Sequence, residues 1–146
     1  MAFIHISGPA RADPFAKQAS IAIAANSVLG FSGNGYVEQA EAASTRVAGV
    51  SLRKVASTDG DYASNTTISV IVPSEEDIFL ADVDTGTAAQ SNVGKRYDLA
   101  TNVDGTAQGI TLSGTTYGVV TVVGVVSTTK VLVKFNGYFA NADISS

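Results

Sequence analysis

Residues able to carry out chemistry are few in this sequence and lie far apart. His5 is the only histidine, and the chain contains no cysteine. A serine or cysteine nucleophile needs a base within hydrogen-bond reach, so a histidine-dependent site would have to form around His5, in the first few residues. The absence of cysteine excludes disulfides and thiolate zinc sites. We therefore expect no nucleophilic catalysis and interpret His5 as a structural contact.

The densest group of carboxylates comprises Glu75, Glu76, Asp77, Asp82 and Asp84. The stretch DVDTG begins like an EF-hand calcium loop, but Gly86 stands at its fifth position, where an oxygen ligand belongs. Glycosidase carboxylates usually lie among aromatic residues, and the chain contains no tryptophan. We interpret the group as a charged strand end and turn, with no cofactor and no catalytic residue. Metal binding at residues 75–84 stays open as an alternative.

The composition limits the class of partner. Charged residues make up 15% of the chain, below the roughly 25% of an average soluble domain. The net charge of −4 argues against nucleic acid, which calls for a basic surface. No secretory signal is recognisable, and the longest apolar run is about half the length of a membrane-spanning helix. We expect a protein made in the cytoplasm, with no nucleic-acid and no membrane partner.

The spacing of apolar residues predicts an all-β, mainly antiparallel fold. Alternation is clearest at residues 68–72 and 131–135, and further strands are predicted at 78–83 and around 47–52. Short turns rich in Gly, Thr and Ser separate the strands. Such strands close most simply into a small β-barrel or β-sandwich.

Local signals add a turn and at most one or two short helices. Asn34 and Gly35 are typical of a type I′ hairpin turn. Thr87 and Gln90 match a capping box and predict one or two helical turns. Residues 37–43 are predicted as either a short helix or a strand edge.

Residues 1–19 are predicted to form an extended N-terminal arm, and residues 20–146 a single β-barrel-like domain. The steps Gly8-Pro9 and Asp13-Pro14 favour extended or turning backbone. The apolar side chains of the arm would need a neighbour to pack against. They are Phe3, Ile4, Ile6, Pro9 and Phe15.

The valine-rich run at residues 117–128 is apolar on both faces of a predicted strand. A barrel interior would cover one face, and strict alternation would group Val120, Val122 and Val126 on a common face. The valines of the other face would be exposed to water, whereas burying each side chain would stabilise the protein by about 1.5–3 kcal/mol. We expect that face to be a subunit interface, with intramolecular cover by a helix or loop as the alternative. The interface candidates are Val119, Val120, Val122, Val123, Val125 and Val126.

Four segments follow one another along the chain: VAGV at 47–50, ISVIVP at 68–73, DVDTGTAAQSNVGKRYDL at 82–99 and VLVKF at 131–135. In this order they resemble small capsid decoration proteins, also called cement proteins, of tailed bacteriophages. The resemblance covers roughly residues 20–139.

The resemblance implies a compact β-barrel on the outer surface of the virion capsid, commonly a homotrimer. Such a protein bridges neighbouring major capsid protein subunits and stabilises the capsid against internal DNA pressure. The resemblance also implies an N-terminal arm, here residues 1–19, that reaches the capsid lattice. It implies no enzyme activity.

Two other classes of function stay open. One is another virion module, in the tail, neck or fibre base, or a carbohydrate-binding β-sandwich for host attachment. Aromatic residues clustered on one group of loops would favour it, but the five tyrosines are spread along the chain. The other is an enzyme that uses the acidic group with calcium, which a calcium-dependent shift in Tm would support.

Overall fold

The computed structural model describes residues 2–41, 47–100 and 104–136. Within these ranges the chain is built of strands and one turn of 3-10 helix, η1 (Gln90–Asn92). The predicted all-β, mainly antiparallel fold is confirmed. The strands are β1 (Phe3–Ser7), β2 (Ala12–Ala16), β3 (Val28–Phe31), β4 (Val37–Gln39), β5 (Val47–Ser51), β6 (Thr67–Ile71), β7 (Ile78–Thr85), β8 (Arg96–Leu99), β9 (Ile110–Thr111), β10 (Val120–Ser127) and β11 (Lys130–Phe135).

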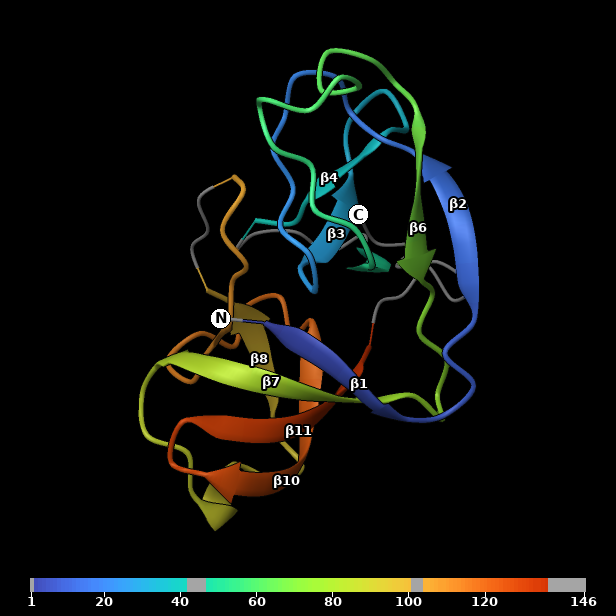
Figure 1. Cartoon of the computed structure of the whole chain (residues 1–146). Helices are drawn as coiled ribbons and strands as arrows, with labels where there is room; N and C mark the ends of the chain where they lie inside the picture. Colours follow the sequence, from blue (N-terminus) through green and yellow to red (C-terminus); the bar gives the residue numbers. More distant parts are fainter. Residues whose placement is uncertain (1, 42–46, 101–103, 137–146) are drawn as a thin grey trace.

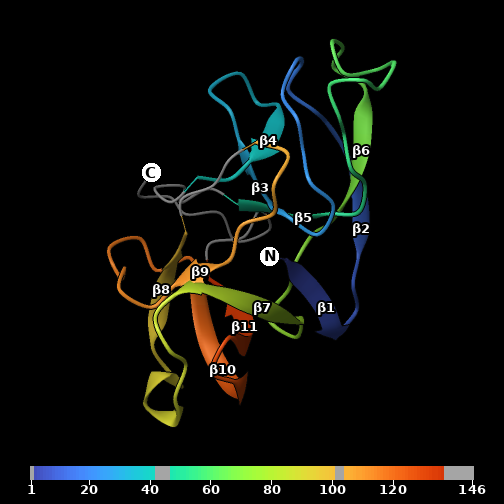
Figure 2. The same cartoon turned by 60° about the vertical axis from the view of Figure 1, so that its left-hand side comes forward.

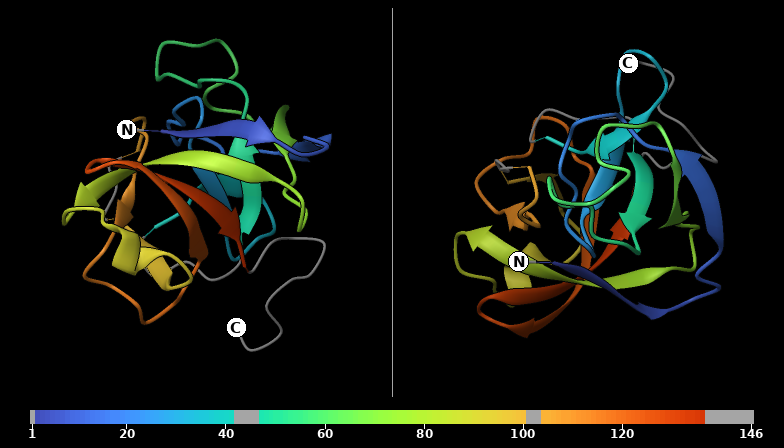
Figure 3. Two further views of the ribbon diagram at one scale, coloured as in Figure 1. Left: turned by 90° about the horizontal axis from the view of Figure 1, so that it is seen from below. Right: turned by 45° about the horizontal axis from the view of Figure 1, so that its top comes forward.

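Five strands close into a barrel, in the order β7, β11, β10, β8, β9 and back to β7. Neighbours in this ring are antiparallel except β9, which pairs in parallel with the last part of β7. Strand β1 pairs antiparallel with the first part of β7 and widens the barrel wall, as Figure 3 shows from below. The barrel and β1 form the lower half of Figure 1.

The remaining five strands form a second antiparallel sheet, in the order β2, β6, β5, β3, β4. This sheet lies above the barrel in Figure 1, and Figure 2 shows the two units from another side. A parallel bridge pairs Lys17, just after β2, with Val37 at the start of β4. The N–H of Gln18 donates to the carbonyl of Val37 at 2.8 Å. These contacts join the two outer strands of the sheet.

The barrel and the second sheet share one hydrophobic core. Val28 and Val50 of the second sheet belong to the same buried cluster as Phe79 of the barrel. The opposite face of the second sheet has its own cluster, which includes Leu29 and Val70. The second sheet is therefore buried on both faces, which explains why all of β5, with the sequence VAGVS, is buried.

Gly49 is required in the middle of β5 by the close approach of β6. Its φ is +153°, a conformation that residues with a side chain rarely adopt. A Cβ atom at this position would collide with the carbonyl oxygen of Ile71. Tertiary packing thus decides the residue type here, although glycine has a poor intrinsic preference for strands.

The first residues differ from the predicted arm, because they are strands of both sheets. Strand β1 pairs with β7, and β2 pairs with β6 over Ala12–Ala16. Phe3 is fully buried and its ring lies 5.6 Å from that of Phe135, centroid to centroid. A boundary at residue 19 therefore does not separate an arm from a barrel. The residues that pair with β1 lie more than 70 positions farther along the chain. Local sequence patterns therefore could not predict this contact.

Two local predictions also differ from the structure. Gly35 has a positive φ of 85°, but Asn34 does not, so the type I′ turn is absent. A wider turn closes this hairpin instead, in which the N–H of Ser32 donates to the carbonyl of Tyr36 at 2.8 Å. Residues 37–39 form strand β4, the second of the two predicted options, while residues 42 and 43 lie outside the described ranges.

The predicted helical turn is present as η1, but its cap is Ala89 and not Thr87. The side-chain oxygen of Asn92 accepts the N–H of Ala89 at 2.8 Å and closes the turn. Within the described residues, no helix is long and apolar enough to cross a membrane.

Candidate interaction surface

His5 is bound to a carboxylate in the connection between the barrel and the second sheet. Its Nε2 lies 2.8 Å from Oδ1 of Asp77, a residue only 1% exposed. The same carboxylate accepts the N–H of Ala10 at 3.0 Å, and the N–H and hydroxyl of Ser74 at 2.7 and 2.9 Å. Burial alone would raise the pKa of Asp77, but these hydrogen bonds outweigh it and lower the pKa from its ordinary value.

This geometry does not match a catalytic triad. In a triad the histidine accepts the proton of the nucleophile and the carboxylate orients the histidine. Here the hydroxyl of Ser74 donates to Oδ2 of Asp77 while His5 binds Oδ1, so the serine is hydrogen-bonded to the carboxylate and not to the histidine. The hydrogen bonds of Asp77 hold the residues around Ala10 against the loop before β7, so the role of this carboxylate is structural.

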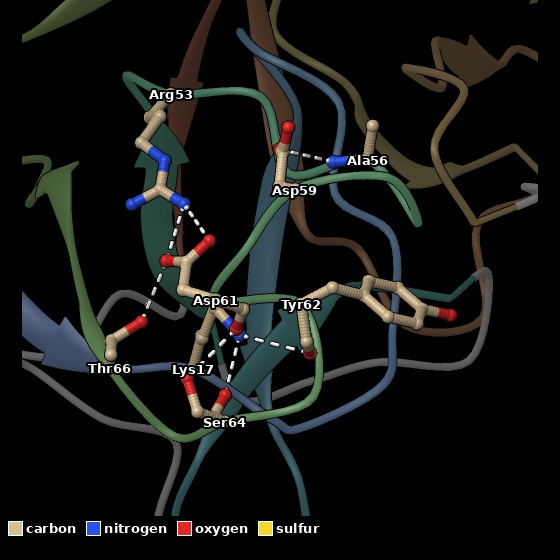
Figure 4. A network of polar contacts seen from close by, with 8 residues as sticks. All are labelled: Lys17, Arg53, Ala56, Asp59, Asp61, Tyr62, Ser64 and Thr66. Atoms are coloured by element: carbon tan, nitrogen blue, oxygen red, sulfur yellow. Dashed lines mark hydrogen bonds and ion pairs between the residues drawn. The ribbon is translucent and has the colours of Figure 1, made fainter.

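A second polar group, shown in Figure 4, holds the loop at residues 56–66 against the second sheet. Lys17 is fully buried, and its Nζ donates to the carbonyls of Asp61 at 2.6 Å and Ser64 at 2.5 Å. The carbonyl of Tyr62 lies slightly farther away, at 3.3 Å. The carbonyls of Asp61 and Tyr62 also accept the N–H groups of Ser64 and Ser20, at 3.1 and 2.7 Å. Lys17 therefore adds a donor to these two carbonyls and supplies the donor for the carbonyl of Ser64.

The carboxylate of Asp61 is used separately, on the outer side of the same loop. Nη2 of Arg53 donates to both of its oxygens, at 2.7 and 2.6 Å, and the hydroxyl of Thr66 donates at 2.7 Å. The hydrogen bonds from Arg53 and Thr66 lower the pKa of Asp61 to about 2. Each charged group of Figure 4 thus has a partner within the loop or its base.

The acidic residues between 75 and 84 do not converge on one point. Asp82 binds the ammonium group of Lys130 at 2.5 Å and accepts the N–H of Ala2 at 2.8 Å. Asp77 is buried at the other end of β7, and Asp84 is exposed beyond Asp82. Among the described residues, no group of three or more His, Cys, Asp or Glu side chains could hold a metal ion.

The predicted contact residues of the first segment fall into different environments. Phe3 is a core residue, and Phe15 is half-buried with its ring 5.9 Å from that of Phe31. Ile4 and Ile6 are exposed, by 45% and 53%, and Pro9 is exposed in the connection to β2. Phe3 and Phe15 thus stabilise the fold, whereas Ile4, Ile6 and Pro9 are accessible to a partner.

The valine candidates are divided by two β-bulges in β10. The register against β11 shifts between Val122 and Gly124 and again between Val125 and Ser127. Each bulge adds one residue and resets the alternation of faces, so Val122 and Val126 do not share a face as strict alternation predicted. Val119, Val120 and Val122 are buried, and Val125 packs partly against the core. Val123 and Val126 are exposed, by 37% and 57%.

An aliphatic stripe crosses the outer face of the barrel wall from β10 to β1. The register aligns Gly124 with Leu132, Leu132 with Leu80, and Leu80 with Ile4. The strand neighbours of Leu80 and Leu132, such as Phe79 and Val133, point into the core. Leu80, Leu132 and the residues that the register pairs with them therefore face outward. Leu132 lies close over Gly124, because a Cβ there would be 3.3 Å from its Cδ1. We call this row, with the exposed Ile6, Val123 and Val126 beside it, the outer stripe.

The sequence contains a signal for the outer stripe that the prediction did not use. In IFLADV, residues 78–83, both alternating sets contain large apolar residues: Ile78 and Leu80 in one, Phe79 and Val83 in the other. The same holds for Leu132 beside Val131 and Val133. A strand apolar on both faces needs cover on both. Leu80 and Leu132 are the functional candidates that the sequence prediction missed.

The outer stripe thus combines exposed aliphatic side chains on β1 and β10 with the partly buried Leu80 and Leu132 between them. The buried polar groups, in contrast, are engaged by internal partners. Compared with models of protein families and with curated proteins, the chain matches none. The geometry of the surface therefore carries the functional argument.

Proposed function

We propose that this protein is a structural component of a tailed-phage virion, which binds the outer surface of the capsid and bridges neighbouring major capsid protein subunits. The observation that carries the proposal is the outer stripe, a row of aliphatic residues on a barrel wall whose inner face already fills a core. Ile4, Ile6, Val123 and Val126 remain exposed on it. A contiguous apolar surface of this kind is typical of protein–protein contact.

The physical chemistry of the chain suits a clamp. A protein that stabilises a lattice by filling the space between subunits needs apolar contact area, which contributes about 25 cal/mol per Å² buried. It does not need reactive groups, and His5, Asp77, Lys17 and Asp61 all stabilise internal connections. Exposed strands also offer main-chain pairing to a partner.

A homotrimer would make the clamp effective. Three copies that engage the lattice together bind more tightly than one, because each later contact becomes intramolecular. Part of the outer stripe would then pack between copies, and the rest would face the capsid. Val123 and Val126 are the exposed members of the six predicted interface valines.

The test uses heads of the tailed phage that encodes the protein, assembled without it. Added protein should co-sediment with these heads and raise the temperature at which they release DNA. The double variant Ile4→Asp/Val123→Asp should bind at least tenfold more weakly, because two charges would have to be buried. The matched control is Ser113→Asp/Thr115→Asp, which adds the same charge at exposed residues outside the outer stripe.

The possible results separate the proposal from its alternatives. Failure of the wild-type protein to bind heads would refute the capsid function. Gold-labelled antibody on the tail, neck or fibre base of intact virions would instead assign the protein to one of those modules. Equal binding by both double variants would show that the contact lies outside the outer stripe.

A further inference from the structure

A groove of about 360 Å³ opens on the outer face of the barrel, at one end of the outer stripe. Its lining includes Arg96 of β8, Thr121 and Val123 of β10, and Lys134 of β11. The register pairs Thr121 with Arg96 on one side and with Lys134 on the other. The two cations therefore flank Thr121 across three adjacent strands, about 10 Å apart in the backbone.

The cations of the groove have no ion-pair partner among the described residues. The ion pairs of that part of the chain involve His5, Arg11, Arg53 and Lys130. Asp98 is two residues from Arg96 on β8, but its carboxylate accepts the N–H groups of Thr116, Tyr117 and Gly118 at 3.1, 2.7 and 2.7 Å. Glu75 also lines the groove without forming an ion pair. The groove thus has a net charge of about +1 on a chain of net charge −4.

The floor and one wall of the groove are held in place by the fold. The hydroxyl of Thr121 donates to Oδ1 of Asn136 at 2.8 Å, and Nδ2 of Asn136 donates to the carbonyl of Gly118 at 2.8 Å. The aliphatic part of Arg96 lies against Gly118, because a Cβ there would be 3.2 Å from Cδ of Arg96. The guanidinium group is therefore positioned by packing of its stem, and no described residue accepts a hydrogen bond from it.

We propose that this groove binds an acidic segment of a partner protein, in which one carboxylate lies between Arg96 and Lys134 and an adjacent aliphatic residue packs on Val123. Under the proposed function, on which this identification of the partner rests, the segment belongs to the major capsid protein. Charge complementarity selects the occupant, because a guanidinium and an ammonium group both favour a carboxylate. Glu75 in the same groove disfavours a doubly charged phosphate, which it would repel.

The first experiment measures peptide binding to the groove in the absence of any capsid. The probe is the peptide acetyl-Leu-Asp-Val-Glu-amide, titrated into the isotope-labelled full chain and followed by amide chemical shifts. Shifts should concentrate at Arg96, Thr121, Val123 and Lys134. The neutral peptide acetyl-Leu-Asn-Val-Gln-amide should bind at least tenfold more weakly. No shift with the acidic peptide, or equal shifts with both, would overturn the inference.

The second experiment compares two double variants that change the net charge equally. Arg96→Glu/Lys134→Glu reverses the charge of both cations in the groove. Lys54→Glu/Lys95→Glu reverses the charge of two exposed lysines outside it. Only the groove variant should bind the acidic peptide more weakly, with an affinity at least tenfold lower. Melting curves of both variants verify that they are folded. Equal peptide affinity in the two variants would overturn the inference.

The same pair of variants separates this inference from the proposed function. If wild-type protein binds the acidic peptide but not phage heads, the groove stands and the capsid function fails. If the groove variant binds heads as well as the wild type does, the capsid function stands and the groove is not its contact. Loss of self-association in the groove variant, without any peptide binding, would make the groove a contact between copies and overturn the inference.

Discussion

The ammonium group of Lys17 lies 2.6 Å from the backbone carbonyl of Asp61, while the carboxylate of the same Asp61 binds Arg53. A buried lysine thus neutralises no acid directly but satisfies the backbone of a loop. Backbone carbonyls left without a donor in a buried site cost about 1–3 kcal/mol each. The loop at residues 56–66, which contains little regular structure, is held by this side chain together with the ion pair of Arg53 and Asp61.

Replacing Lys17 with methionine should destabilise the fold by about 1–3 kcal/mol, because the carbonyl of Ser64 loses its donor while the side-chain volume is kept. Urea denaturation measures the change, and hydrogen exchange should show the loss first at residues 56–66. Lys54→Met, at an exposed position, serves as the control and should stay within about 0.5 kcal/mol of wild type. A similar small change for Lys17→Met would show that water replaces the ammonium group.

Asp77 should make stability depend on pH in the acidic range. Folding lowers the pKa of this carboxyl from its ordinary value of 3.8. Its contribution is therefore fully present above the unfolded pKa and is lost as the pH falls through the lower folded pKa. Asp77→Asn should be less stable than wild type by about 1–3 kcal/mol at pH 7, and the difference should shrink below about pH 4.

Denaturation at a series of pH values tests this prediction for Asp77. Glu76→Gln changes the neighbouring exposed carboxylate and should follow the wild-type curve. A constant difference between wild type and Asp77→Asn from pH 7 to below pH 3 would show that the ionised form of Asp77 gives no special stabilisation.

Val122 and Val123 should respond differently to aspartate although they are neighbours. Val122 is fully buried, so an unpaired charge there costs several kcal/mol and should unfold a domain only about 5–15 kcal/mol stable. Val123 is 37% exposed on the bulge, so Val123→Asp should fold and lose only contacts to other molecules. Circular dichroism and light scattering distinguish the two outcomes. An unfolded Val123→Asp would indicate that the bulge residue is needed by the core.

Removal of the first strand should unfold the protein, in contrast to what an independent arm would allow. Phe3 fills the core beside Phe135, and a Phe→Ala change in such a site costs about 3–5 kcal/mol. Phe3→Ala should therefore lower the Tm by many degrees. Ile4→Ala, one residue along and exposed, should have little effect on the Tm. If both variants have the same Tm as the wild type, β1 contributes little to the stability of the fold.

Much of the fold was predictable, because its signals are local. Alternation at residues 68–72 and 131–135 predicts half-buried strands, and the structure has β6 and β11 there. The helical turn near Gln90 and the all-β class also follow from composition and spacing. The sequence alone also indicates that the valine run is too apolar for a strand with one solvent face.

Only the tertiary structure decided which of these apolar faces are covered. Strand β5 and strand β10 are both apolar on two faces, but β5 lies between two clusters, whereas the outer face of β10 is exposed. The bulges at Val123 and Val126 arise from pairing with β11, so alternation alone could not place these valines. Phe3 and the pairing of Arg96 and Lys134 across Thr121 depend on contacts between distant segments. Such contacts follow from the closure of the barrel, which no local pattern of residues encodes.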